Sequence, residues 1–148
     1  MTKILVSGCL LGENCKYNGG NNEAPEVISF CRNHSYVSVC PETAGGLPSP
    51  RPPAEKTGDR IIDKEGKDVT EAFVRGAEIS LSECLSAAEA EGKKIEGAIL
   101  KANSPSCGAG KIYDGTFSGT LTDGYGVFAS KLAQLGIEVI TEKEKIKW

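Results

Sequence analysis

Three cysteines follow apolar segments that are typical of buried β-strands. They are Cys9 after Lys3–Ser7, Cys40 after Tyr36–Val39, and Cys107 after Gly97–Lys101. Each adjoins Gly or Pro in a tight loop, as in Ser104–Gly110 around Cys107. Thiols at such positions suit metal binding or sulfur chemistry, because ligands of open α/β sheets bind where the strands end.

The segments that must position these cysteines alternate between strands and helices. The expected helices begin near Pro25, at Asp68 with Glu71 as a capping box, and at Thr122–Asp123, and a fourth strand covers Ile137–Ile140. This alternation predicts one three-layer, Rossmann-like α/β domain over residues 1–148, with a mainly parallel four-stranded sheet. The expected order of the four strands is 2-1-3-4. Neighbouring strands lie ~4.8 Å apart, so the three cysteine loops should converge on one small pocket.

The remaining segments are less regular. A small hairpin is expected from Arg60–Asp63 and Lys67–Val69, and Leu47–Glu55 reads as a long proline-rich loop. A loop of that length in a small domain is typical of a binding loop or lid. Residues 111–122, rich in Gly, Thr and Ser, are predicted to be a connection without strands.

The chain has 148 residues and a net charge of −3, and its shares of apolar and charged residues are those of an ordinary globular protein. The slight excess of acidic residues argues against extended nucleic-acid binding, which needs clustered Lys and Arg. No apolar run approaches the about 20 residues that span a bilayer, and the first residues lack the apolar core of a signal peptide. We therefore expect a cytoplasmic protein without membrane contact. The single histidine, His34, leaves little basis for histidine-dependent catalysis.

The six cysteines divide into three groups. Cys31 and Cys84 fall on apolar helix faces and are expected to be core residues. Cys15 lies in a polar loop and is either an exposed thiol or an extra ligand, and we expect the loop to turn it away from the other thiols. Cys9, Cys40 and Cys107 either pack as buried apolar residues or form a shared site. Because all three follow a strand and adjoin Gly or Pro, the sequence favours a shared site.

Three thiolates without a nearby histidine suit a soft metal centre. Zinc usually takes four ligands, often in paired C-x-x-C spacing, which this chain lacks. An iron–sulfur cluster held by three cysteines would keep one iron open, and an open metal site acts as a Lewis acid.

Five polar residues are expected around these thiols. Glu42 would carry protons, or is a solvated loop carboxylate. Ser104 and Ser106 would hydrogen-bond a substrate or water, or stabilise the turn. Arg51 and Glu55 in the proline-rich loop would orient a ligand, or pair with each other on the surface.

Three ordered motifs resemble the small bacterial thiouracil desulfidase family across nearly the whole chain. They are Ser7–Gly12 with Tyr17–Gly19, Val39–Glu42 with Gly45–Leu47 and Pro50–Glu55, and Leu100–Lys101 through Ser104–Gly108. The resemblance implies a desulfidase-like domain with a [4Fe–4S] cluster held by residues matching Cys9, Cys40 and Cys107. Its fourth iron would bind the sulfur of a thiolated pyrimidine. The implied reaction is non-redox, converting a 2-thiouracil-like base and water to the oxo base and hydrogen sulfide.

The resemblance also implies that the family's acidic residue matches Glu42 and its serine matches Ser104. Two alternatives remain at this point. One is a non-enzymatic carrier of sulfur or clusters, in which Glu42 would be dispensable. The other is a zinc-binding or thiol-redox domain, which would hold zinc without iron or form a disulfide between Cys40 and Cys107.

Overall fold

The main sheet consists of four parallel strands, and the computed structural model describes all 148 residues. Its spatial order is β2-β1-β5-β8, with bounds β1 Thr2–Ser7, β2 Tyr36–Val39, β5 Lys94–Leu100 and β8 Glu138–Thr141. The predicted four-stranded parallel sheet and its strand order are therefore confirmed. All four carboxyl ends point to the same edge, which is the edge that carries the functional loops.

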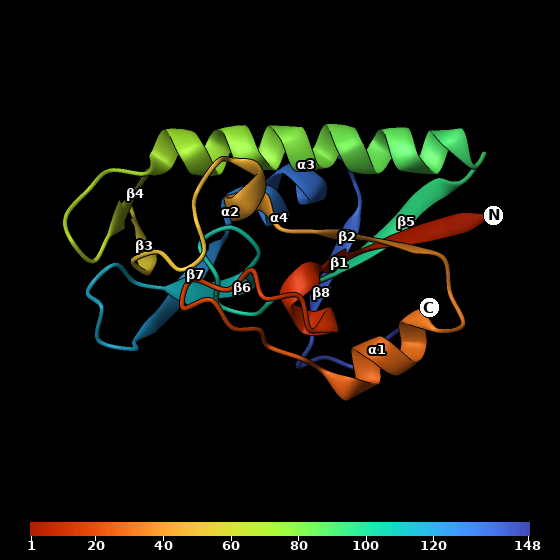
Figure 1. Cartoon of the computed structure of the whole chain (residues 1–148), viewed down its shortest axis with the longest axis horizontal. Coiled ribbons are helices and arrows are strands. Elements are labelled where there is room, and N and C mark those ends of the chain that lie inside the picture. The colour runs from red at the N-terminus through yellow and green to blue at the C-terminus, as the bar shows by residue number, and fades with distance from the viewer.

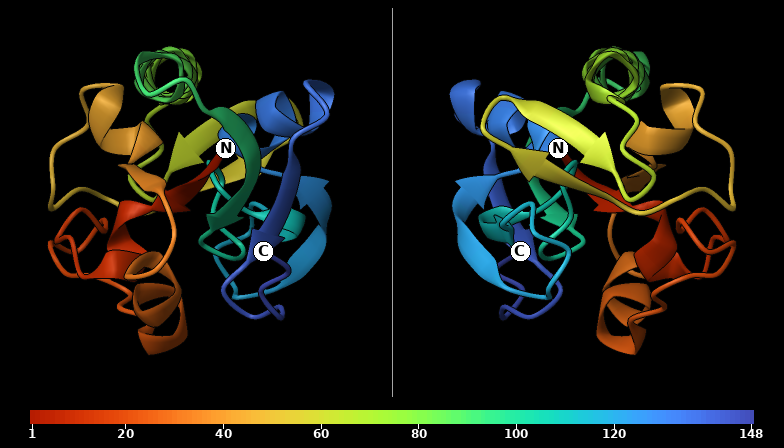
Figure 2. Two further views of the ribbon diagram at one scale, coloured as in Figure 1. Left: turned by 90° about the vertical axis from the view of Figure 1, so that its right-hand side faces the viewer. Right: turned by 90° about the vertical axis from the view of Figure 1, so that its left-hand side faces the viewer.

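Helices cover both faces of this sheet (Figures 1 and 2). The helices are α1 Pro25–Cys31, α2 Pro41–Ala44, α3 Thr70–Ala90 and α4 Val127–Gln134, with a 3-10 turn η1 at Gly8–Leu11. Successive strand residues alternate between faces, so Leu5 packs with residues of α3 and α4 whereas Ile4 and Val6 pack with α1. This arrangement confirms the three-layer α/β prediction.

Two antiparallel hairpins extend from the layered core, and both differ from the sequence prediction. The first pairs β3 Ala54–Thr57 with β4 Arg60–Asp63, so its turn is Gly58–Asp59. The expected pairing of residues 60–63 with 67–69 is present but short: Val69 N–H donates to the Ile61 carbonyl and Asp63 N–H to the Lys67 carbonyl, each at 2.8 Å, on either side of the bridge Ile62–Asp68. The partner that the sequence did not predict for residues 60–63 is β3. The proline-rich segment therefore ends in a strand.

The second hairpin lies where a connection without strands was expected. It pairs β6 Ala109–Tyr113 with β7 Leu121–Tyr125. Thr122 and Asp123 belong to β7 and do not cap a helix, so that prediction is wrong. Helix α4 begins four residues later, after Gly126.

The start of the long helix also differs in detail. Asp68 does not form a capping box with Glu71, because α3 begins at Thr70 and Val69 precedes it. The Asp68 carboxylate instead accepts a hydrogen bond from the Thr70 backbone N–H at 3.0 Å and pairs with Arg60. It still stabilises the positive end of the helix.

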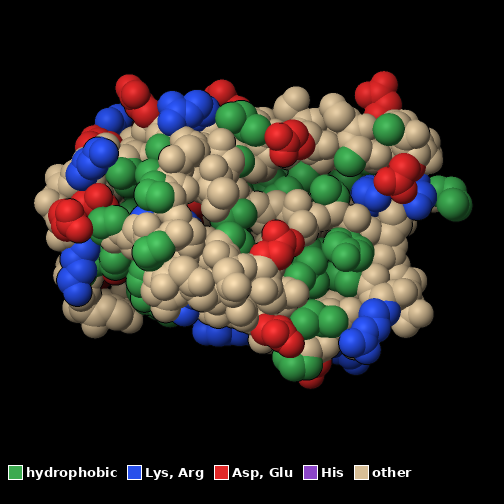
Figure 3. Space-filling model, in the orientation of Figure 1, with side chains coloured by type: hydrophobic (Ala, Val, Ile, Leu, Met, Phe, Trp, Pro, Cys, Tyr) green, Lys and Arg blue, Asp and Glu red, His purple; other side chains and the backbone are tan.

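The outer surface carries charges of both signs. On the face shown in Figure 3, basic and acidic side chains are interspersed. No helix combines the length and the apolar character that crossing a membrane would require.

Candidate active site

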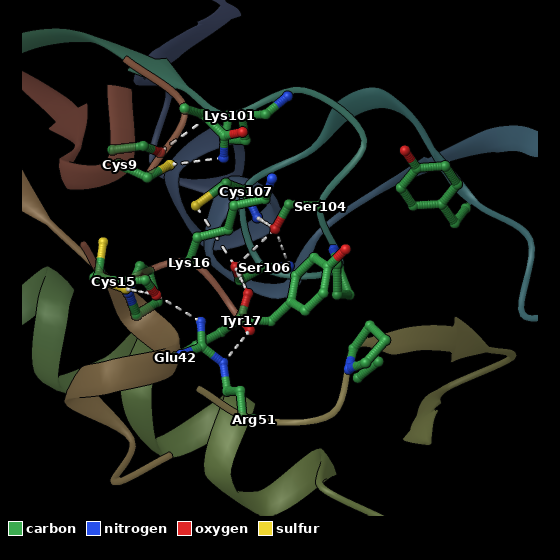
Figure 4. A pocket seen from close by; sticks show the side chains of 18 of the residues that line it. Cys9, Cys15, Lys16, Tyr17, Glu42, Arg51, Lys101, Ser104, Ser106 and Cys107 are labelled. Atoms are coloured by element: carbon green, nitrogen blue, oxygen red, sulfur yellow. Dashed lines mark hydrogen bonds and ion pairs between the residues drawn. The ribbon is translucent and has the colours of Figure 1, made fainter. Parts of the chain in front are cut away.

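A cavity of about 470 Å³ opens where the parallel strands end, and the three strand-end cysteines line it. Figure 4 shows two of them, Cys9 and Cys107. Cys9 lies in η1 just after β1, Cys40 follows β2 directly, and Cys107 follows β5 after a short loop. The structure thus brings together the three cysteines that the sequence singles out. The cause is topological, because adjacent parallel strands deliver their following loops to one place.

The cysteine thiols of the cavity affect each other's ionisation. Burial raises the pKa of the Cys107 thiol to about 12, and the neighbouring Cys9 adds to that rise. Burial also raises the pKa of Cys9, with Cys40 contributing in the same direction. Thiolates held together in a buried site oppose one another unless a positive centre is present, so this donor set fits a cationic, thiophilic group.

The spacing of the thiols favours a cluster over a single ion. No three His, Cys, Asp or Glu side chains lie close enough together to hold one metal ion. A four-iron cluster takes each cysteine on a different iron and therefore spreads its ligands. The three thiols match such a cluster in donor type and, as its only cysteine ligands, would leave one iron without a cysteine.

Cys15 contributes a fourth thiol to the cavity wall. The expectation that its loop turns it away is wrong, because Cys15 lines the same cavity and its thiol lies within hydrogen-bonding reach of Cys40. A hydrogen bond from the Cys15 thiol lowers the pKa of Cys40. Cys31 and Cys84, in contrast, are buried in the two faces of the core, as predicted.

The Cys107 loop is held by backbone amides of α4. Val127 N–H donates to the Pro105 carbonyl and Phe128 N–H to the Ser106 carbonyl, each at 2.9 Å. Gly126 is required at the contact, because a Cβ there would lie 2.4 Å from the Ser106 carbonyl carbon. The loop that presents Cys107 is therefore fixed by the start of a core helix.

Ser104 stabilises the turn before Cys107, and together with Ser106 it forms a chain of hydrogen bonds that leads to Glu42. The Ser104 Oγ accepts from the backbone N–H groups of Ser106 and Cys107, both at 3.1 Å. It also lies 2.9 Å from the Ser106 Oγ, which donates to Glu42 Oε2 at 2.9 Å. Because Ser104 already accepts two hydrogen bonds, its own hydroxyl proton is free to point to Ser106 or into the cavity.

Glu42 is held at both carboxylate oxygens. It lies in the first turn of α2, directly after Cys40-Pro41. Arg51 Nε donates to its Oε1 at 3.1 Å, opposite the Ser106 contact on Oε2. Its side chain is 18% exposed, so the carboxylate borders the cavity while its orientation is fixed. The reading of Glu42 as a freely solvated loop carboxylate does not agree with these contacts.

Arg51 ties the proline-rich loop to the wall of the cavity. Its side chain is only 6% exposed, and it donates through Nη1 to the Pro48 carbonyl and through Nη2 to the Cys15 carbonyl. The predicted surface pair between Arg51 and Glu55 is wrong, because Arg51 pairs with Glu42. An arginine that contacts three segments in this way positions the carboxylate.

Glu55 lines the cavity but is also committed to the backbone. It lies in β3, and its Oε1 accepts from the N–H groups of Gly115 at 3.0 Å and Phe117 at 3.1 Å. Tyr113 and Phe117 of the second hairpin complete this part of the wall, together with Tyr17. Sequence reasoning missed Tyr113 and Phe117; the Asp114-Gly115 pair between two short β-prone segments was the available sign of a hairpin.

A close contact between α2 and α3 positions Cys40 and Glu42. A Cβ on Gly76 of α3 would lie 1.8 Å from the Pro41 carbonyl oxygen, and one on Gly45 would lie 2.0 Å from the Ala72 carbonyl oxygen. Both contacts are with backbone atoms, so the helices can meet at this distance only through glycine.

We expect Gly76→Ala to destabilise the fold by about 1–3 kcal/mol, because the added methyl must push α2 away from α3. Gly→Ala inside a helix ordinarily stabilises a protein by about 1 kcal/mol. A destabilised Gly76→Ala protein would therefore be direct evidence for the close contact between α2 and α3. Urea unfolding measures the effect. Ser82→Ala, at an exposed position of the same helix, is the matched control, and equal stability of the two variants would contradict the prediction.

Comparisons with known proteins converge on one family. The model of the 2-thiouracil desulfurase family matches residues 4–144. The chain is 41% identical over 151 residues to YbbK of Bacillus subtilis (strain 168), described as uncharacterized, covering 95% of this chain and 96% of that protein. It also matches a solved structure described as TudS, a [4Fe-4S]-dependent thiouracil desulfidase, with a TM-score of 0.84 and 42% identity, covering 97% of this chain and 92% of the other.

Proposed function

This chain belongs to the 2-thiouracil desulfurase family, and from that premise we propose that it is an enzyme that desulfurates a thiolated pyrimidine. The substrate would be a 2-thiouracil-like base. With one water it would give the oxo base and hydrogen sulfide, without net oxidation or reduction. The observation that carries the proposal is the placement of three strand-end cysteines and the oriented carboxylate of Glu42 in one cavity.

A [4Fe–4S] cluster is the proposed cofactor, and Cys9, Cys40 and Cys107 would hold it. The similar solved protein is described as [4Fe-4S]-dependent, and the donor set fits, as argued above. When bound through three cysteines, such a cluster supplies an open, thiophilic iron that withdraws charge from a carbon–sulfur bond.

Glu42 would move the protons of the reaction. The oxygen of water bonds to the ring carbon, the carbon–sulfur bond breaks, and both water protons finish on sulfur. A carboxylate beside the attacking water can accept its proton and then return it to the departing sulfur. The hydrogen bonds from Arg51 and Ser106 fix the orientation of both carboxylate oxygens of Glu42 at the cavity.

Ser104 would orient the base. Its hydroxyl stands at the end of the chain that leads through Ser106 to Glu42. Because Ser106 donates its proton to Glu42, Ser104 donates to Ser106 in the unliganded site, and it would turn that proton to a carbonyl or ring nitrogen of the bound base. Ser106 would then act mainly on Glu42, and Arg51 would act on the substrate only through that carboxylate.

The test is anaerobic reconstitution with iron and sulfide, followed by incubation with 2-thiouracil. We expect sulfide and uracil in equal amounts. A fully loaded protein that releases sulfide from neither 2-thiouracil nor 4-thiouracil would overturn the proposal. Zinc in place of iron in anaerobically purified protein would favour the zinc alternative instead.

A further inference from the structure

Phe117 adopts a backbone conformation that bulky residues rarely accept. Its φ is +57°, and the only other residue except glycine with a positive φ is Asn103. Asparagine tolerates the left-handed region, whereas an aromatic residue there is an outlier that the surrounding structure must stabilise. An observed outlier of this kind calls for a functional explanation.

The stabilising group is the carboxylate of Glu55. Its side chain is buried, with the residue 8% exposed, and Oε1 accepts from the N–H groups on both sides of Thr116, those of Gly115 and Phe117. Gly115 packs against β3 so closely that a Cβ would lie 2.5 Å from Thr57 Oγ1. Figure 1 shows the loop between β6 and β7 beside β3. Two backbone hydrogen bonds to one buried carboxylate oxygen are strong enough to fix this conformation.

The conformation does not serve the hydrophobic core. Phe117 belongs to none of the three core clusters, and it is half-buried and lines the cavity. The strained backbone therefore presents an aromatic ring to the same cavity that holds the cysteines and Glu42. A rigid, flat, apolar surface at that position suits a planar heterocycle.

We propose that Phe117 is a specificity-determining residue that packs against the ring of the substrate, and that Glu55 is its positioning residue. This inference rests on the proposed function, and it adds the requirement that the substrate be a planar ring. An acyclic thioamide or thiourea has no ring to stack and would gain little from Phe117.

The test measures the affinity of the reconstituted protein for uracil, the desulfurated product, by titration calorimetry. Phe117→Gly removes the ring and also relieves the positive φ, so the loop can keep its course. We expect about a 10- to 100-fold weaker Kd, as for the loss of an aromatic partner of a base. In turnover, KM for 2-thiouracil should rise by a similar factor while kcat changes little. Phe117→Leu keeps apolar bulk at this position, so it should lose less affinity for uracil than Phe117→Gly does. It replaces the glycine variant in the test if that variant does not fold.

Two further variants separate positioning from general structure. Glu55→Ala should weaken uracil binding as Phe117→Gly does, whereas Glu55→Gln should retain most of the affinity because its amide oxygen still accepts from the loop. Leu121→Ala, at an exposed position of β7 on the same hairpin, should bind as the wild type does.

Wild-type affinity in Phe117→Gly, equal losses in Leu121→Ala, or no uracil binding by the wild type would overturn the inference. Absence of sulfide release by the wild type would overturn the proposed function instead. Since the Kd of uracil requires no turnover, the two failures are distinguishable.

Discussion

Replacing Glu42 with Gln should lower kcat for 2-thiouracil desulfuration by about 100- to 10,000-fold, the range expected for loss of a general acid–base group. Gln is nearly isosteric but cannot carry a proton. It also offers only one acceptor where the carboxylate has two, so it cannot accept from both Arg51 Nε and Ser106 Oγ. KM should change much less than kcat, because the role proposed for Glu42 is to move protons between water and sulfur, and that role contributes little to binding the ring. Sulfide release under saturating 2-thiouracil measures the effect.

Iron and acid-labile sulfide content provide the control for this variant. Both should equal those of the wild type, because Glu42 is not among the proposed ligands. Glu26→Gln, an exposed substitution in the first turn of α1, should leave kcat unchanged. Undiminished turnover by the Glu42→Gln protein would exclude proton transfer by Glu42. Undiminished sulfide or cluster delivery to an acceptor protein, without turnover of any thiobase, would point to the carrier alternative.

The parallel sheet was predictable because its strands carry their own signals. Lys3–Ser7, Tyr36–Val39 and Gly97–Lys101 are short, mainly apolar runs that end near turn residues, and each lies within or overlaps a strand of the sheet. Buried strands must be apolar on both faces, so the pattern is set by their environment. Once three such strands are parallel, the convergence of Cys9, Cys40 and Cys107 follows from chain geometry alone.

The two hairpins could not be predicted in the same way. β7 has the sequence Leu-Thr-Asp-Gly-Tyr and is almost entirely exposed, so burial gives its sequence no apolar pattern. β3 follows two prolines that argue against a strand, yet Pro52 and Pro53 precede its first residue and remove no hydrogen bond from it. Both hairpins are specified by cross-strand pairing and by glycine turns, which a single sequence shows only weakly.

The hydrogen-bond partners of the polar side chains in the site could not be predicted from the sequence either. Spacing placed Glu42 close to Cys40, but its pairing with Arg51 depends on a loop that returns nine residues later. The hydrogen bonds from the Phe117 loop to Glu55 join residues 62 positions apart. Such contacts depend on the packing of the hairpins, so they could be found only after the fold was known.

Replacing Cys107 with Ser should abolish cluster binding and, with it, desulfuration. The thiolate is the ligand that iron–sulfur clusters require, and a serine hydroxyl is a much harder and less acidic donor. Cys107 is buried and its loop is fixed by α4, so the serine variant should keep the course of the loop. Anaerobically reconstituted wild type should contain about four irons per chain, and the variant fewer than one. Iron analysis together with the visible absorption of the cluster measures this outcome.

The other cysteines decide whether that loss is specific. Cys31→Ala and Cys84→Ala should keep full iron content although they lose some stability, because both thiols lie in the core and outside the cavity. Cys15→Ser is the sharper comparison, since Cys15 adjoins Cys40 within the cavity. If three cysteines hold the cluster, this variant also keeps about four irons per chain. Loss of iron in Cys15→Ser would make Cys15 the fourth ligand, and the position that the sulfur of the substrate requires would then be filled by the protein itself.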